Sequence, residues 1–110
     1  MKFAEGMTSK QKVEALQRYV LVHSVLYYEM NTSVISDKRF DRVSRLLADK
    51  IQKFGPKKIA STQYGYAFKD FDGSTGFDLP DRLSEKDKKH IQQMATYVLR
   101  WYRKDGKRDV

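Results

Sequence analysis

The strongest constraint on the fold is an apolar stripe with helical spacing, followed after a short polar stretch by a second one. The first stripe recurs at intervals of three or four residues through Val13, Leu16, Val20, His23, Tyr27 and Met30, and it is widened by Ala15, Tyr19, Val22 and Leu26. This spacing is typical of one face of an α-helix. Because the apolar side is broad, we expect this helix to be buried between other elements and not laid on a surface.

The polar stretch and the residues after it predict a helix-turn-helix hairpin. Asn31, Thr32 and Ser33 interrupt the stripe with side chains that favour turns. Ser36 is a good N-cap, and Asp37 places a negative charge where the helix dipole favours it. The second stripe runs through Phe40, Val43, Leu47, Ile51 and Phe54, and Gly55-Pro56 is expected to end the helix.

The remainder of the chain predicts a connection and one more helix. Residues 57–80 carry three of the six glycines and alternate aromatics at Tyr64, Tyr66 and Phe68. We predict an extended, ordered connection, with or without a short strand, that its aromatics pin to the helices. Ser84 is the expected cap of a long C-terminal helix, whose apolar face comprises Ile91, Met94, Val98 and Trp101 with Ala95, Leu99 and Tyr102 beside it. With Trp101 in the core, Trp101→Ala should cost about 3–5 kcal/mol.

These patterns predict a mainly α-helical chain that forms one small domain over residues 1–110, with 1–7 and 104–110 flexible. The sequence has no cysteine, which excludes disulfides, thiolate metal sites and cysteine catalysis. It also lacks a signal-peptide pattern and any run of the roughly 20 apolar residues that a membrane span needs. We therefore expect a soluble, cytoplasmic protein.

The charge balance favours a polyanionic partner. Lys and Arg number 22 against 14 Asp and Glu, which gives a net charge of +8. The candidate nucleic-acid-binding residues are Lys38, Arg39, Arg42, Arg45 and Lys53 of the second helix and Arg100, Arg103 and Lys104 of the last. If the two basic faces adjoin, they make a stripe that binds phosphates without reading bases. The alternative is a solvated basic surface.

The turn between the first two helices is the best candidate for a ligand site. Its residues are Tyr27 and Tyr28 before the turn and Asp37, Phe40 and Asp41 after it. The two aspartates are four residues apart and share one helix face, so the turn becomes a concave elbow of aromatic and acidic groups. Such an elbow could accept a planar cationic ring. Alternatively, Asp37 only complements the helix dipole, Asp41 pairs with Arg45, and the aromatics are core.

The stretch VLYYEMNTSVISDKRFDRVSRLL resembles the N-terminal Ia domain of bacterial NAD-dependent DNA ligases, and the likeness covers about residues 13–52. In that family the Ia domain binds the nicotinamide mononucleotide half of NAD. The resemblance implies that Tyr27 contacts the nicotinamide side and that Asp37 and Asp41 accept hydrogen bonds from the nucleotide. Tyr28 stands where the ligases often have histidine, and Phe40 stands where they have tyrosine, which removes one hydroxyl.

The same resemblance argues against catalysis. Ligases use the lysine of a Lys-x-Asp-Gly motif as their nucleophile. Here KDFDG at 69–73 is one residue too long, and RKDG at 103–106 puts arginine in the lysine position. Arginine stays protonated and cannot be that nucleophile. We therefore expect no enzyme activity.

Metal sites have little support. Asp70, Asp72, Ser74, Asp78 and Asp81 follow the spacing of a calcium loop, but Thr75 replaces the required glycine. His23 is expected in the core and His90 at the surface, so no metal or catalytic role is predicted for either.

Three functional hypotheses remain open. The first is a non-catalytic, ligase Ia-like accessory or inhibitory protein of phage or mobile-element type, working in a bacterial host cell by binding a protein partner or nucleic acid. The second is a stand-alone module that binds nicotinamide mononucleotide or NAD. The third is a basic protein that binds nucleic acid without sequence preference.

Overall fold

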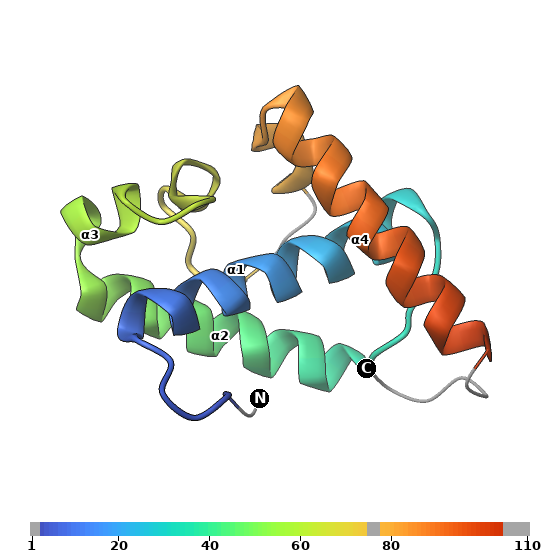
Figure 1. Cartoon of the computed structure of the whole chain (residues 1–110), viewed down its shortest axis with the longest axis horizontal. Helices are drawn as coiled ribbons and strands as arrows, with labels where there is room; N and C mark the ends of the chain where they lie inside the picture. The colour runs from blue at the N-terminus through green and yellow to red at the C-terminus, as the bar shows by residue number, and fades with distance from the viewer. Residues whose placement is uncertain (1–2, 75–77, 105–110) are drawn as a thin grey trace.

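The chain folds into helices arranged in layers around one central helix. The computed structural model describes residues 3–74 and 78–104. The main elements are α1 (Ser9–Ser24), a π-helical turn (Val25–Glu29), α2 (Asp37–Phe54), α3 (Pro56–Ala60) and α4 (Glu85–Lys104). Short 3-10 turns lie at Gly65–Phe68 and Pro80–Arg82, and these described ranges hold no strand. The predicted mainly α-helical class with a long last helix is confirmed (Figure 1). The prediction of flexible ends falls partly on 1–2 and 105–110, which lie outside the described residues.

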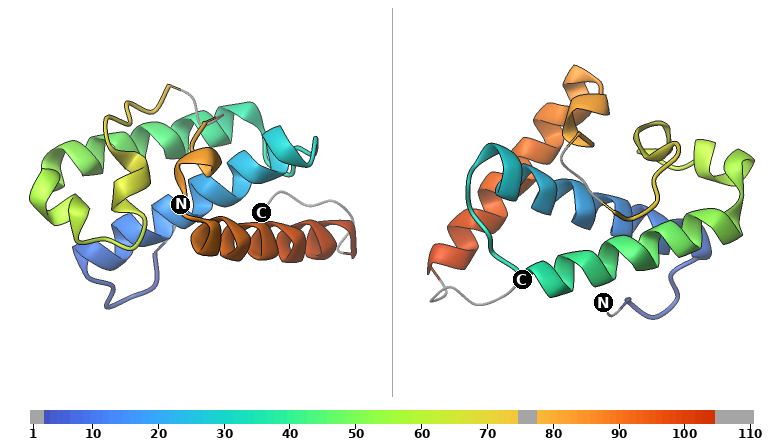
Figure 2. Two further views of the ribbon diagram at one scale, coloured as in Figure 1. Left: turned by 90° about the horizontal axis from the view of Figure 1, so that it is seen from above. Right: turned by 180° about the vertical axis from the view of Figure 1, so that it is seen from behind.

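Helix α1 lies between α2 and α4 (Figure 2) and packs against both of them. Leu16, Val20, Leu21 and Leu26 of this central segment are fully buried. Apolar side chains are therefore buried on more than one face of this segment, as the broad stripe in the sequence predicted. Burial of this helix on two sides places its apolar side chains at the centre of the core that the other elements share.

The helix boundaries follow from local capping. The Thr8 amide donates to Gln11 Oε1 at 2.9 Å while the Gln11 amide donates to Thr8 Oγ1 at 3.1 Å, which closes a capping box at the start of α1. Ser36 Oγ accepts from the Arg39 amide at 3.1 Å at the start of α2. At the other end of α2, Gly55 adopts a φ of +88°, a conformation that favours glycine. The Ser36 cap and the end of α2 at Gly55, which the sequence predicted, are confirmed.

The segment between α2 and α4 is more helical than the predicted extended connection. Pro56 starts α3 directly after Gly55, since proline is well suited to a first helical position. Tyr64 and Phe68 are buried while Tyr66 is exposed, which is the spacing of a helical turn and not of a strand. The Tyr66 hydroxyl instead donates to Asp87 Oδ2 at 2.5 Å and accepts from the Ser84 amide at 3.0 Å, and so joins this segment to the start of α4.

The expected core position of Trp101 is wrong. Ile91 and Ala95 are fully buried, and Val98 and Tyr102 continue the same stripe with partial burial. Trp101 is 44% exposed. Successive helical residues are about 100° apart, so Trp101 lies to one side of the stripe that ends at Tyr102, toward the outer face of α4.

A pair of substitutions tests this distribution of burial. Leu16→Ala should lower the free energy of unfolding by about 2–5 kcal/mol, because it leaves a cavity at the centre of the layers. Trp101→Ala should cost at most about 1 kcal/mol, as expected for a surface position. Urea denaturation followed by far-UV circular dichroism measures both values. Equal losses in the two variants would contradict the assignment of Trp101 to the surface.

Alkaline pH offers a second test of the core. The Tyr64 hydroxyl is buried and has no hydrogen-bond partner within the described part of the chain. Burial, and next the nearby Asp87 charge, raise the pKa of Tyr64 above its ordinary value of 10.0. The neutral phenol therefore supports the fold below about pH 10, and this contribution is lost as the pH rises through the higher folded-state pKa. Tyr64→Phe should reduce the fall in the free energy of unfolding above pH 10 relative to the unchanged chain. An identical decline of the free energy of unfolding in both proteins, measured by urea denaturation at several pH values, would contradict a raised pKa of Tyr64 in the folded state.

Candidate functional site

A pocket of about 470 Å³ opens where the π-helical turn, the connection after it and the first turns of α2 meet. Its lining residues are His23, Tyr27, Tyr28, Thr32, Ser33, Val34, Ile35, Asp37, Lys38, Phe40, Asp41 and Ser74. All five ligand-binding residues proposed from the sequence are among them. The structure therefore brings together groups from both sides of the predicted elbow.

The π-helical turn decides how the tyrosines are presented. The Met30 amide donates to the carbonyl of Val25, five residues earlier, at 3.0 Å. A turn of this width changes the direction of the side chains that follow, so Tyr27 leaves the buried stripe in which the sequence pattern placed it. Tyr27 is 47% and Tyr28 43% exposed, with their rings edge to face at 4.8 Å. Single π-helical turns of this kind are frequent at functional sites.

The connection after the π-helical turn is held by its own hydrogen bonds. Asn31 adopts a φ of +50°, and the Thr32 amide donates to the Leu26 carbonyl at 2.8 Å. The Ser33 hydroxyl donates to the Ile35 carbonyl at 2.8 Å. Val34 is buried, which anchors the connection to the core. The predicted turn is confirmed, and the pocket wall that it forms is an ordered one.

The opposite wall carries charge. Asp37 is exposed in the first turn of α2, and Asp41 lies one turn further along. Asp41 Oδ2 pairs with Arg45 at 3.2 Å, with the Arg45 side chain 75% and the Asp41 side chain 49% exposed. An exposed pair of this kind is worth little and exchanges readily with solvent or a ligand. The Lys38 side chain adds one ammonium to the same wall, so the pocket offers two carboxylates and one cation.

Sequence reasoning missed part of the pocket. The sequence pattern predicts only the tyrosines and the residues of the second helix, but the pocket is also lined by Thr32, Ser33, Val34 and Ile35. A signal was present, because Ile35 and Phe40 flank the Ser36 cap at the positions of a hydrophobic staple. His23 is buried as expected, with its ring 4.4 Å from that of Tyr19, and it also lines the pocket.

The candidate nucleic-acid-binding cations divide between two helices. Lys38, Arg39, Arg42, Arg45 and Lys53 belong to α2, and Arg100, Arg103 and Lys104 belong to α4. These helices lie on opposite sides of α1 (Figure 2). Lys53 is already paired with Asp49 at 3.0 Å. The cations therefore lie on two helices, and whether their side chains form one stripe stays a prediction.

The described residues contain no cluster of three or more histidine and acidic side chains suited to holding a metal ion. None of the helices in the described ranges is both long and apolar enough to cross a bilayer.

A scan against protein-family models, a search of curated proteins and a search of solved structures each found no match to this chain. The assignment of a function therefore depends on the chemistry of the site.

The weak pairing of Asp41 can be measured directly. Arg45→Ala should change the free energy of unfolding by no more than about 0.5 kcal/mol, because the pair is exposed and lies at the surface of α2. Urea denaturation gives the value. A loss above about 2 kcal/mol would mean that Asp41 is committed to a structural ion pair and is not available to a ligand.

Proposed function

We propose that this chain is a non-catalytic binding module whose elbow pocket takes a nucleotide with a planar cationic ring, such as nicotinamide mononucleotide. The observation that carries the proposal is the convergence of Tyr27, Tyr28, Asp37, Phe40 and Asp41 on one pocket. The resemblance to ligase Ia domains assigns three of them, Tyr27, Asp37 and Asp41, to nucleotide binding, while Tyr28 and Phe40 replace the residues that are usual in that family. They come from two segments of the chain, and the π-helical turn brings the first segment's tyrosines to the surface there.

The chemistry of the two walls suits the parts of such a ligand. Tyr27 and Tyr28 offer partly exposed aromatic groups to a cationic ring, an arrangement that is attractive through the ring quadrupole. The Asp37 and Asp41 carboxylates attract the same positive charge and can accept hydrogen bonds from ribose hydroxyls. Lys38 is the group that can meet a phosphate.

The dimensions support a ligand of this size. Small-molecule pockets commonly enclose about 300–1,000 Å³, and this one holds about 470 Å³. The lining combines aromatic and apolar groups with a few charged ones, as small-molecule sites usually do. Phe40 gives the pocket an apolar side where a tyrosine would have offered a hydroxyl.

Binding without turnover defines the biological role that we propose. The chain lacks the Lys-x-Asp-Gly nucleophile, so the bound nucleotide would be sequestered or sensed and not consumed. A cytoplasmic accessory or inhibitory protein, of the phage or mobile-element type that the resemblance suggests, could act in this way. A protein partner that reads the occupied pocket would complete such a role.

Two matched substitutions on α2 test the proposal. Asp41 and Asp49 are each paired with a cation four residues later, but only Asp41 lines the pocket. Asp41→Asn should weaken binding of nicotinamide mononucleotide about 10-fold or more, since a hydrogen bond to a charged group contributes about 1.5–3 kcal/mol. Asp49→Asn should leave the affinity within about 2-fold. Isothermal titration calorimetry measures both, and amide NMR shifts locate the ligand.

The unchanged protein provides the decisive control. Saturable NMR shifts confined to the pocket residues are expected, and Phe40→Tyr should bind no more weakly because it restores a hydroxyl. Absence of saturable shifts at millimolar nucleotide, or equal losses in Asp41→Asn and Asp49→Asn, would refute the proposal.

A further inference from the structure

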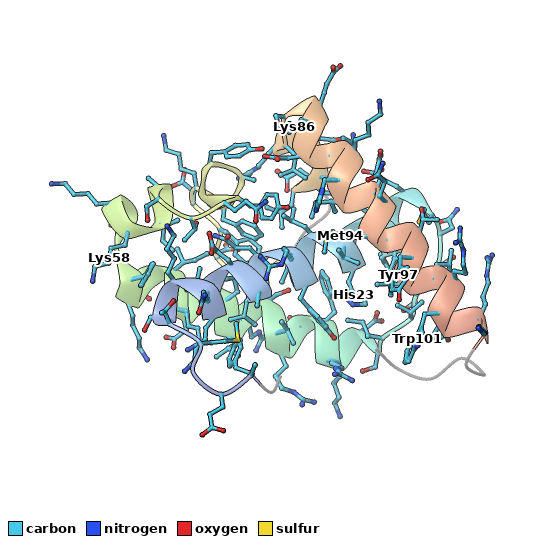
Figure 3. All side chains as sticks on the ribbon, viewed as in Figure 1. His23, Lys58, Lys86, Met94, Tyr97 and Trp101 are labelled. Atoms are coloured by element: carbon cyan, nitrogen blue, oxygen red, sulfur yellow. The ribbon has the colours of Figure 1, made fainter. Side chains whose placement is uncertain are left out.

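The outer face of α4 combines exposed aromatic rings with cations. Tyr97 is 69% and Trp101 44% exposed, and they lie one turn apart on the helix (Figure 3). Tyr97, but not Trp101, also lines a shallow groove of about 430 Å³, together with Lys89, Gln92, Gln93, Thr96 and Arg100. Large aromatic side chains on a solvent-exposed basic face have no role in the core, so their exposure needs another explanation.

The charge of this helix has one sign over most of its length. The two acidic residues of α4, Glu85 and Asp87, lie in its first turn, and no acidic residue follows from position 88 to position 104. Lys88 is held by Asp81 at 3.0 Å. Lys89, Arg100, Arg103 and Lys104 make no ion pair with any residue that the structure describes. Within the described residues, the outer face of α4 therefore carries positive charges that no carboxylate pairs.

Helical spacing arranges these groups into one strip. Residues spaced by four or seven positions lie on the same face of a helix. On α4 this spacing places on one face Lys89, Gln93, Arg100 and Lys104, with Tyr97 beside them. At a rise of 1.5 Å per residue, the distance from Lys89 to Lys104 is about 22 Å. We call Lys89, Gln93, Tyr97, Arg100, Trp101 and Lys104 the outer strip.

We propose that the outer strip of α4 binds single-stranded nucleic acid, with unpaired bases stacked on Tyr97 and Trp101 and phosphates held by Arg100, Lys104 and Lys89. Surfaces that bind single strands without sequence preference combine cations along the backbone with aromatic rings that stack on bases. A duplex hides the faces of its bases, so its phosphates alone would meet this strip. The proposal concerns a different surface from the elbow pocket and does not depend on it.

Charge also argues against other occupants. A second copy of the chain would set two unneutralised basic faces against each other, which opposes self-association through this strip. The apolar side of α4 is already packed on α1 through Ile91 and Ala95, so it cannot be laid in a membrane. In a single-stranded nucleic acid, the phosphates can pair with the cations of the strip and the flat bases can stack on its aromatic rings.

The only tryptophan of the sequence lies in the strip and reports its occupancy. Titration with a 12-residue oligothymidylate should quench Trp101 fluorescence, and fluorescence anisotropy should show tighter binding than to a duplex of equal length. Tyr97→Ala and Trp101→Ala should each weaken single-strand binding by about 5- to 100-fold, which corresponds to the loss of one stacked base. Trp101→Phe should retain most of the affinity because it keeps a ring. Circular dichroism checks that each variant is folded.

A charge-matched pair separates the strip from the overall positive field. Arg100→Glu with Lys104→Glu changes the net charge by as much as Lys57→Glu with Lys58→Glu on α3, and Figure 3 shows Lys58 and Trp101 at opposite ends of the molecule. The α4 variant should lose at least about 10-fold more affinity than the α3 variant. Equal losses, or full affinity in Tyr97→Ala, would show binding by diffuse charge and overturn the proposal. Concentration-dependent dimers abolished by Trp101→Ala would overturn it in favour of self-association.

Discussion

The burial of α1 between α2 and α4 is the constraint on which the other features depend. A helix that is packed on two sides has little of its length left for a ligand. Leu16, Leu21 and Leu26 contribute side chains to a shared core, so their positions are fixed by packing. Side chains of this segment can reach solvent and a ligand only near its end, where the core ends. The π-helical turn lies at that end, and it exposes Tyr27 and Tyr28 directly after the fully buried Leu26.

The π-helical turn is also bound to α4, which packs on the side of α1 opposite α2 (Figure 2). Gln92 of α4 donates from Nε2 to Glu29 Oε1 at 3.1 Å, and Lys88 lies 3.9 Å from the other oxygen of the same carboxylate. These contacts hold the last residue of the π-helical turn while the ordered connection after it leads into α2. The position of the elbow pocket therefore depends on α1, α2 and α4 together, although its lining comes mostly from the π-helical turn, the connection and α2.

Local features of this fold could be predicted from the sequence because they depend on neighbouring residues. The Thr8 capping box, the Ser36 cap and the end of α2 at Gly55 each involve side chains and backbone within a few positions. Features that depend on distant packing were predicted less well. Helical periodicity assumes 3.6 residues per turn, so it placed Tyr27 inside, and the π-helical turn moves it out. The position of Trp101 depends on where the core ends beside α4, which no local pattern encodes.

In the candidate site, too, the features that depend on neighbouring residues could be predicted and those that depend on the folded backbone could not. The sequence identified its aromatic and acidic groups because a turn between two helices necessarily brings their facing ends together. It could not show that the connection itself forms a wall, since the contribution of Val34 and Ile35 depends on backbone bonds such as that from the Thr32 amide to the Leu26 carbonyl. Gln92 belongs both to the groove on α4 and to the bond with Glu29. Because that link is one exposed hydrogen bond beside the 3.9 Å contact of Lys88 with the same carboxylate, we expect only weak coupling between the two surfaces, and each can serve its own ligand.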